Sequence, residues 1–285
     1  MKMKWLDLKN CACFGVAGNF TGHLEQAGEA TDFKDVKTLE KNAPKALFPT
    51  YIPNLKKNCG IPEFLEVFPF DSKKIVFPEN EQKIQIEPEC AVVFSAEWND
   101  GKIISLKPVC FAASNDVSIR KAGAKKISLK KNWGKSSKGI SENLIPLDSF
   151  DEKSVLNNYR IASFMVRGEN IFEYGENSAV RDYSYIYEKL ESWLIEKINF
   201  QKDEGPAENV NFYLNQAGFP EKIMVSIGAT RYTDFGERNF LLKGDRSVVA
   251  LYPGEKYSAE EIKNLVQKND FSDSRISVLS QEVVL

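Results

Sequence analysis

The sequence lacks the features that mark several functional classes. Its 38 basic and 40 acidic residues nearly cancel, to a formal net charge of -2. A dedicated nucleic-acid or membrane-surface binder normally carries an excess of lysine and arginine, so neither partner is expected. No apolar run approaches the length of about 18 residues that spans a bilayer. The N-terminus also lacks the long apolar core of a signal peptide. We therefore expect a soluble cytoplasmic protein.

Cysteine and histidine are scarce. The cysteines are Cys11, Cys13, Cys59, Cys90 and Cys110. Their odd number and the absence of CxxC spacing favour neither a disulfide framework nor a zinc site. Cys90 and Cys110 lie in apolar runs and are predicted to behave as small buried hydrophobic residues. His23 is the only histidine. A solitary histidine is more often a surface or core residue than a catalyst, yet it can exchange a proton near neutral pH, so both interpretations stay open.

Two carboxylates stand out at the entrance to an apolar run. Glu87 and Glu89 are separated by Pro88 and precede Cys-Ala-Val-Val-Phe. In an extended chain, side chains two residues apart share a face, so both carboxylates should point the same way. Like charges at such distances are accommodated by a shared proton or a divalent cation. Hard oxygen ligands favour Mg²⁺, Mn²⁺ or Ca²⁺. Exposed surface glutamates are the ordinary alternative, unless a third ligand converges on the pair.

Asp116 is the candidate third ligand. It follows the apolar run 109–113 within Ser-Asn-Asp-Val-Ser-Ile-Arg, at the predicted end of a strand. The ordinary interpretation of Asn-Asp is a turn, because both side chains bond their own backbone. The basic stretch 121–138 follows, and we expect Lys130, Lys131 and Lys138 to lie in a solvated loop.

Periodicity predicts the secondary structure. Strands are expected at 103–106, 109–113, 223–227, 248–251 and 276–279, with extended pieces at 46–48 and 64–68. Segments 161–166 and 171–174 are expected to pair as a hairpin. Helices are expected at 182–200, capped by Asp182, at 207–216, and at 258–267, where Ser258 and Glu261 form a capping box. Thr21 is expected to cap a helix that carries His23.

The chain resembles the fumarylacetoacetate hydrolase superfamily in the order of its motifs, from about residue 13 to residue 252. The similar segments are Gly18-Asn19-Phe20-Thr21-Gly22-His23, Glu87-Pro88-Glu89, Asn115-Asp116-Val117-Ser118-Ile119-Arg120, Gly134-Lys135-Ser136, Val166-Arg167-Gly168-Glu169, Ile227-Gly228-Ala229-Thr230 and Leu242-Lys243-Gly244-Asp245. Each fragment is common alone. Their shared order and spacing are specific.

The resemblance implies an α+β, mainly β fold with a mixed β-roll core and peripheral helices, and a homodimer. It implies an N-terminal segment at 1–74 with a lid-like helix around His23, a metal-binding core at 75–253, and a C-terminal extension at 254–285 packed on the same domain. Mg²⁺, Mn²⁺ or Ca²⁺ would bind Glu87, Glu89 and Asp116. The implied catalytic residues are His23 and Lys135. The implied substrate contacts are Asn19, Arg120, Ser136 and Thr230.

The chain departs from the family pattern beside its histidine. Smaller members carry a glutamate three residues after the histidine, which forms a water-activating dyad; here that position is Gln26. Glu25 would point about 160° away from His23 around a helix and cannot simply substitute. An acid from elsewhere in the chain could still partner His23. In the glycine-threonine loop, Ala229 occupies the threonine's place.

Two functional hypotheses follow. The first is a divalent-metal-dependent hydrolase or decarboxylase that cleaves a C–C bond of a small oxo-acid or diketone through an enolate. The second is a catalytically degenerate protein that keeps the fold for a binding or structural role.

Overall fold

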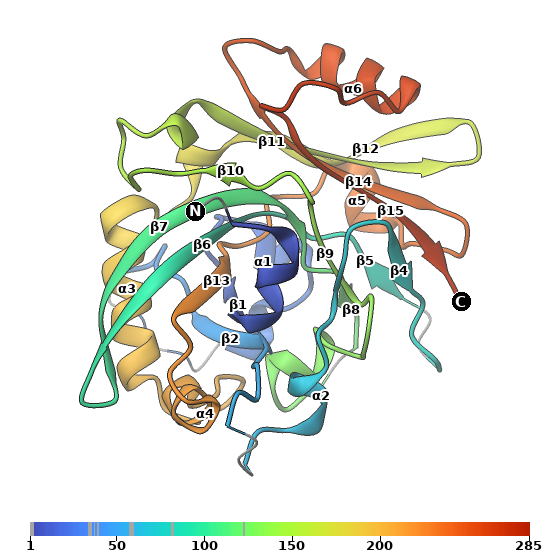
Figure 1. Ribbon diagram of the computed structural model, residues 1–285. Helices are drawn as coiled ribbons and strands as arrows, with labels where there is room; N and C mark the ends of the chain where they lie inside the picture. Colours follow the sequence, from blue (N-terminus) through green and yellow to red (C-terminus); the bar gives the residue numbers. More distant parts are fainter. Residues whose placement is uncertain are drawn as a thin grey trace.

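The computed structural model describes residues 3–33, 36, 38, 40–56, 60–80, 83–121 and 123–285, and two packed β-sheets dominate it (Figure 1). Cys59 lies outside the described residues. The model confirms the predicted mainly β, α+β class. Cys90 and Cys110 are buried, as predicted.

The larger sheet has the order β2-β1-β13-β6-β7-β9-β3, with β10 paired to β7. Its strands are β1 (Ala12–Ala17), β2 (Ala46–Tyr51), β3 (Phe70–Asp71), β6 (Pro88–Asn99), β7 (Lys102–Asn115), β9 (Lys138–Ile140), β10 (Ile145–Pro146) and β13 (Lys222–Ser226). The long antiparallel hairpin of β6 and β7 curves strongly across the molecule (Figure 1). It includes both runs predicted at 103–113, joined as one strand. Because β1 pairs with β13, the N-terminal segment is built into this sheet.

The smaller sheet has the order β12-β11-β14-β15-β4. Its strands are β4 (Lys74–Val76), β11 (Tyr159–Arg167), β12 (Asn170–Ala179), β14 (Arg246–Pro253) and β15 (Ser277–Val284). The predicted hairpin is β11 and β12, which turn at Gly168. A two-stranded ribbon of β5 (Ile84–Gln85) and β8 (Ser118–Ile119) stands apart. The C-terminal strand β15 pairs with β14 and β4, and it contacts β7 of the larger sheet.

Helices surround the sheets (Figure 1). The α-helices are α1 (His23–Gln26), α2 (Glu63–Glu66), α3 (Tyr187–Phe200), α4 (Val210–Ala217), α5 (Asp234–Arg238) and α6 (Ala259–Lys268). Short 3-10 helices are η1 (Trp5–Asn10), η2 (Ala30–Phe33), η3 (Ile127–Lys130), η4 (Val155–Asn158) and η5 (Val180–Asp182). No helix among the described residues is both long enough and apolar enough to cross a bilayer.

The sequence predicted one helix N-terminus correctly and two incorrectly. Ser258 and Glu261 form the predicted capping box of α6, and the apolar face of this helix covers the smaller sheet. The predicted caps at Thr21 and Asp182 are wrong. Gly22, with a φ of 90°, precedes α1 and provides no side-chain cap, while Asp182 belongs to η5 and bonds the Ala179 amide. The extended piece predicted at 64–68 is instead mostly helix α2, because its packing overrides the aromatic preference for strands.

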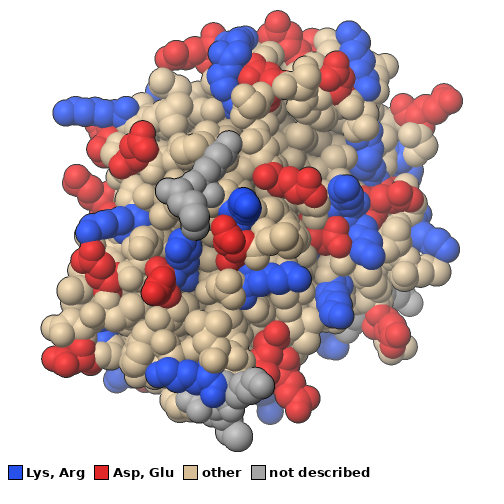
Figure 2. Space-filling model, viewed as in Figure 1, with Lys and Arg blue, Asp and Glu red and all other residues tan. Residues whose placement is uncertain are grey.

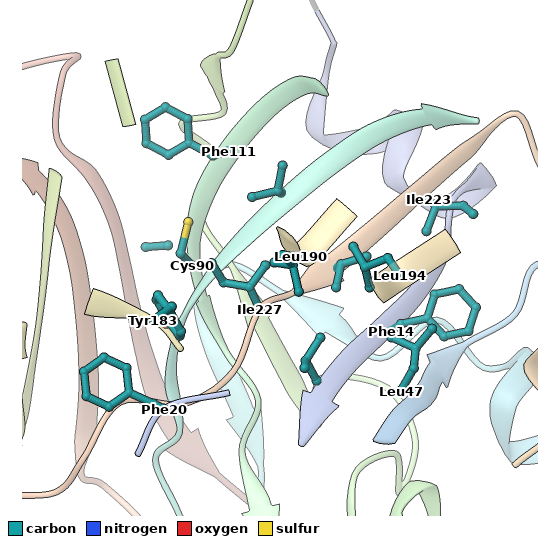
Figure 3. Packing of buried hydrophobic residues seen from close by; sticks show 14 of the residues in the cluster. Phe14, Phe20, Leu47, Cys90, Phe111, Tyr183, Leu190, Leu194, Ile223 and Ile227 are labelled. Carbon is teal, nitrogen blue, oxygen red and sulfur yellow. The ribbon is translucent and has the colours of Figure 1, made fainter. Parts of the chain in front are cut away.

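The main core lies between α3 and the larger sheet. Figure 3 shows Leu190 and Leu194 of α3 facing Ile223 and Ile227 of β13 and its following loop. These side chains recur at the helical period that the sequence predicted. The surface in Figure 2 mixes basic and acidic side chains without a patch of one sign, in agreement with the balanced composition.

Leu194 provides a test of this packing. We expect Leu194→Ala to lower the free energy of unfolding by about 2–5 kcal/mol, because it removes apolar contacts and leaves a cavity. Leu6→Ala should change it by about 0.5 kcal/mol or less, because Leu6 is 66% exposed. Urea unfolding measures both. Equal effects of the two substitutions would contradict the assigned core.

Candidate active site

Three buried carboxylates meet where β6 begins and β7 ends. Oxygen atoms of Glu87, Glu89 and Asp116 all lie within 4.8 Å of one another. All three residues are at least 97% buried. This arrangement could hold a metal ion. The third carboxylate that the sequence required beside the glutamate pair is therefore present.

Strand pairing brings these carboxylates together. Pro88 pairs with Asn115 in the register of β6 and β7, so the start of one strand lies beside the end of the other. The Asp116 amide donates to the Glu87 carbonyl at 3.0 Å. In return, the Glu87 amide donates to the Asn115 side-chain oxygen at 3.1 Å. The backbone thus fixes both acidic residues across one strand junction.

Two lysines enter the acidic cluster, and this finding corrects the predicted solvated loop. The Lys131 ammonium lies 2.5 Å from Glu87 Oε2 and 2.7 Å from Asp116 Oδ2, so it bridges two of the three carboxylates. Lys138 Nζ lies 2.9 Å from Asp116 Oδ1 and also donates to the Val117 carbonyl. Both lysines are at least 98% buried. Their placement results from η3 and β9, which turn them toward the triad.

A second ion-pair group adjoins the first. Arg120 pairs with Glu87 Oε1 at 2.8 Å and with Glu29 Oε1 at 2.8 Å. It also donates to the Tyr232 hydroxyl. Lys130 pairs with Glu29 at 2.9 Å. Arg120, predicted to contact substrate, is thus an internal counter-ion here. Glu29 therefore also belongs to the site. The sequence analysis did not select it, because its polar stretch gave no periodic signal.

Burial and neighbouring charges give the carboxyl groups different proton affinities. Burial, together with Asp116 and Glu87, raises the pKa of Glu89 well above its ordinary value. Burial would also raise the pKa of Glu87, but Lys131 and Arg120 outweigh it and hold that pKa well below its usual range. Glu87 is therefore the permanent anion, and Glu89 is the carboxyl that most readily carries a proton.

The two lysines are also unequal. Burial would lower the pKa of Lys131, but Asp116 and Glu87 raise it above its ordinary value, so its ammonium stays charged. Burial lowers the pKa of Lys138 to about 8, although Asp116 opposes this shift. Lys131 is therefore the more strongly held cation of the pair.

His23 covers the cluster from the N-terminal segment. It is the first residue of α1, 95% buried, and its ring centroid lies 5.0 Å from that of Tyr232. Its Nδ1 has no hydrogen-bond partner among the described residues. Burial lowers the pKa of His23, and Arg120 contributes to the same shift although Glu87 opposes it. The imidazole is consequently neutral near pH 7 and can accept a proton.

The residues beside His23 fasten its segment. The Gln26 side chain exchanges two hydrogen bonds with the Tyr232 backbone, at 2.8 and 3.1 Å, so the position of the family's dyad glutamate serves here as an anchor. Asn19 donates both side-chain N–H groups to the carbonyls of Tyr185 and Ile227. These bonds use both amide donors of Asn19 and fix its side chain, while its substrate contact stays a prediction.

The remaining predicted residues differ in burial and in hydrogen bonding. The structure does not bring Lys135 into the cluster, because its side chain is exposed. Ser136 is buried but donates to Asp71 at 2.8 Å, which occupies its hydroxyl. Thr230 is buried with a hydroxyl that has no partner among the described residues, and its amide donates to the Pro88 carbonyl. The Gly-Lys-Ser pattern thus selected an outward-facing lysine, while Lys138, three residues on, points inward.

A small cavity joins His23 to the cluster. Its volume is about 20 Å³, enough for one water-sized species. The lining residues include His23, Glu29, Glu87, Glu89 and Lys131. A broader groove of about 1160 Å³ lies among α3, the residues 36, 38 and 43–45, and the loop after α3, but none of its described lining residues belongs to the predicted site. Of the two spaces, the smaller one is the one that predicted site residues line, namely His23, Glu87 and Glu89.

A divalent ion does not fit the arrangement of charges around the triad. The carboxylates of Glu29, Glu87 and Asp116 face four cations, and Glu89 is the carboxyl that most readily carries a proton, so positive charge is already in excess without a metal. The cations are Arg120, Lys130, Lys131 and Lys138. An ion bound by Glu87 and Asp116 would lie beside the ammonium that already bridges them, which is unfavourable in a buried site. Lys131 would have to leave for a divalent ion to bind.

Solved structures share this fold. The 2-keto-3-deoxy-D-arabinonate dehydratase complexed with magnesium and 2,5-dioxopentanoate matches with a TM-score of 0.53 and 14% identity, over 100% of this chain and 82% of that chain. The 5-carboxymethyl-2-hydroxymuconate delta-isomerase from Mycobacterium smegmatis matches at 0.50 and 13%, over 96% and 78%. A Yersinia pestis CO92 protein assigned to the fumarylacetoacetate hydrolase family matches at 0.51 and 13%, over 95% and 92%.

These likenesses define the fold as that of the fumarylacetoacetate hydrolase superfamily, as the motifs predicted. The chain itself belongs to the family of unknown function DUF5718, whose model matches residues 29–283. No curated protein sequence matches it. The low identity to the solved structures marks a divergent member of the fold.

The unequal carboxyl groups can be tested with two matched substitutions. Glu87→Gln should lower the free energy of unfolding by about 3–5 kcal/mol, because it removes the anion that pairs with Lys131 and Arg120. Glu89→Gln should change it by about 1 kcal/mol or less, because an amide resembles the protonated carboxyl. Urea unfolding at pH 7 of metal-free protein measures both. A larger loss for Glu89→Gln would contradict the assignment.

Proposed function

We propose that this protein is an enzyme that cleaves a C–C bond of a small oxo-acid or diketone through an enolate, by hydrolysis or decarboxylation. The observation that carries the proposal is a neutral, partly unpartnered His23 that shares a small buried cavity with the Lys131 ammonium. A proton acceptor and a fixed cation across one water-sized space are the groups that enolate chemistry needs.

The cation supports the proposed bond cleavage. When a β-oxo acid loses carbon dioxide, the electron pair of the broken C–C bond moves onto the ketone oxygen, which becomes an enolate. Lys131 has three N–H donors; it donates one to Glu87 and forms an ion pair with Asp116. A third can donate to an oxyanion in the cavity. Fixed charge in a buried site stabilises such an anion more than water does.

His23 supports the proton transfer. In hydrolysis, the neutral imidazole would take a proton from a water that attacks the carbonyl carbon, and it would later return that proton to the enolate carbon. Gln26 cannot accept a proton, so the acid that supports His23 would be Glu29, which lines the same cavity. Arg120 and Lys130 hold Glu29 in place. The expectation that another acid partners His23 thus has a specific candidate.

Substrate entry requires the N-terminal segment to open, because a cavity of about 20 Å³ cannot hold an oxo-acid. Gly18 and Gly28 flank the segment, with φ values of 74° and 70° that favour glycine. Rotation at these positions would lift His23 while the strands stay in place. The homodimer stays a prediction from the resemblance, and the cytoplasmic location stays a prediction from the composition.

Two alternatives have observations behind them. Convergence of Glu87, Glu89 and Asp116 favours the same reaction with Mg²⁺ or Mn²⁺ as the cation that opposes the enolate, and one neighbour of the same fold binds magnesium. The small volume of the cavity and the anchoring role of Gln26 favour a degenerate binding or structural protein.

Turnover assays separate these possibilities. We expect metal-free protein to consume oxaloacetate or an acylpyruvate, and His23→Asn to reduce the rate by about 100-fold or more, because it removes the proton acceptor. Glu25→Gln, on the exposed face of the same short helix, should leave the rate unchanged. Substrate loss is followed by ultraviolet absorbance.

Activity that appears only with added Mg²⁺ or Mn²⁺ would favour the metal-dependent form. The absence of turnover with and without metal, across the oxo-acids tested, would favour the degenerate protein.

A further inference from the structure

We infer that Lys131 is the resident cation of the acidic triad and takes the place in which a divalent metal would bind. The cation that the site holds is a separate question from the proposed reaction, because binding and labelling measurements decide it without turnover. We expect a protein whose triad rejects divalent ions until Lys131 is removed.

The contacts of Lys131 carry the argument. Its ammonium lies 2.5 Å from Glu87 and 2.7 Å from Asp116, so one positive charge bridges two of the three converging carboxylates. The remaining carboxyl, Glu89, accepts a hydrogen bond from the Gly228 amide at 2.9 Å. Each carboxyl group of the triad therefore already has a cation or a hydrogen-bond donor beside it. A bound metal ion would otherwise provide this charge compensation.

The protein also holds this lysine in place. Phe48 lies beneath the ammonium, with 5.3 Å from Nζ to the ring centroid. Gly15 lets that ring approach, because a Cβ at this position would lie 2.3 Å from the Phe48 ring. The adjacent Asn132 donates to the carbonyls of Thr50 and Val67, which anchors the backbone. The contact with Phe48 and the anchored backbone fix Lys131 in the site, so it differs from a surface lysine whose side chain only turns toward the interior.

The neighbouring cations exclude an additional ion. Arg120 occupies the second oxygen of Glu87, and Lys138 occupies the second oxygen of Asp116. Removal of Lys131 alone would free one oxygen on Glu87 and one on Asp116, close to Glu89, and would leave its place open beside the water-sized cavity that Glu87 and Glu89 line. Three hard oxygen donors would then face an unfilled position suited to Mn²⁺ or Mg²⁺.

The test is calorimetric titration of metal-stripped protein with Mn²⁺. We expect wild type to show no saturable binding up to millimolar Mn²⁺, and Lys131→Met to bind at least about 100-fold more tightly, because a buried like charge is removed. Lys135→Met, which removes an exposed lysine nearby, should match wild type. Adding Asp116→Asn to Lys131→Met should abolish the acquired binding. Equal Mn²⁺ affinity of wild type and Lys131→Met would overturn the inference.

A second measurement on wild type covers the case in which Lys131→Met does not fold. Acetic anhydride labelling followed by peptide mass spectrometry reports whether Lys131 is accessible. We expect Lys131 to stay protected with or without millimolar Mn²⁺, while Lys135 is labelled. Micromolar Mn²⁺ binding by wild type, or Mn²⁺-dependent labelling of Lys131, would overturn the inference. Neither result depends on turnover, so failure of the proposed reaction remains distinguishable.

Discussion

The ion pair of Lys131 with Glu87 and Asp116 is the interaction on which the site depends. Without it, Glu87 would keep only Arg120 and Asp116 only Lys138 as counter-ions, and their two facing oxygens would be buried close together with no positive charge between them, which is unfavourable in a protein interior. The fold concentrates this charge because the strands that carry the acidic residues end at one junction. The lysines are thus part of what allows the two strands to end there.

The rest of the molecule supports that junction from several directions. Asn115 links the end of β7 to Ser247 and Gln281 in the smaller sheet. Gln281 is fully buried and also donates to the Lys138 carbonyl. The C-terminal strand, for which the sequence gave no role, therefore steadies the strand that carries one site lysine. The N-terminal segment closes the other side through His23 and Gln26. Both ends of the chain complete a site whose acids come from its middle.

Part of this site was predictable because its signals are local. Glu87 and Glu89 share a face by strand geometry, Asp116 stands at a strand end, and Ser258 begins its helix with the expected box. These inferences need only neighbouring residues. The overall class was predictable for a related reason, since the motif order fixes the order of the strands that bear the acids.

The counter-ions were not predictable in the same way. Which lysine in the stretch 121–138 turns inward depends on η3 and β9, and the sequence pattern favoured Lys135, which is exposed. Lys138 is the first residue of β9 and is followed by Gly139 and Ile140. These two small or apolar neighbours are the signal that could have indicated a buried lysine. Glu29 gave no signal, because its role arises from contacts with Arg120 and Lys130, more than 90 residues away. Long-range charge pairing is invisible to local periodicity.

The most direct test of this account is calorimetric titration of metal-stripped wild-type protein with oxalate, a mimic of an enolate, in the absence and presence of Mg²⁺. If Lys131 is the cation that opposes the enolate, oxalate binds without metal, and Mg²⁺ does not strengthen its binding. If oxalate binds only when Mg²⁺ is present, the triad holds a divalent ion in the working enzyme and the central claim is wrong.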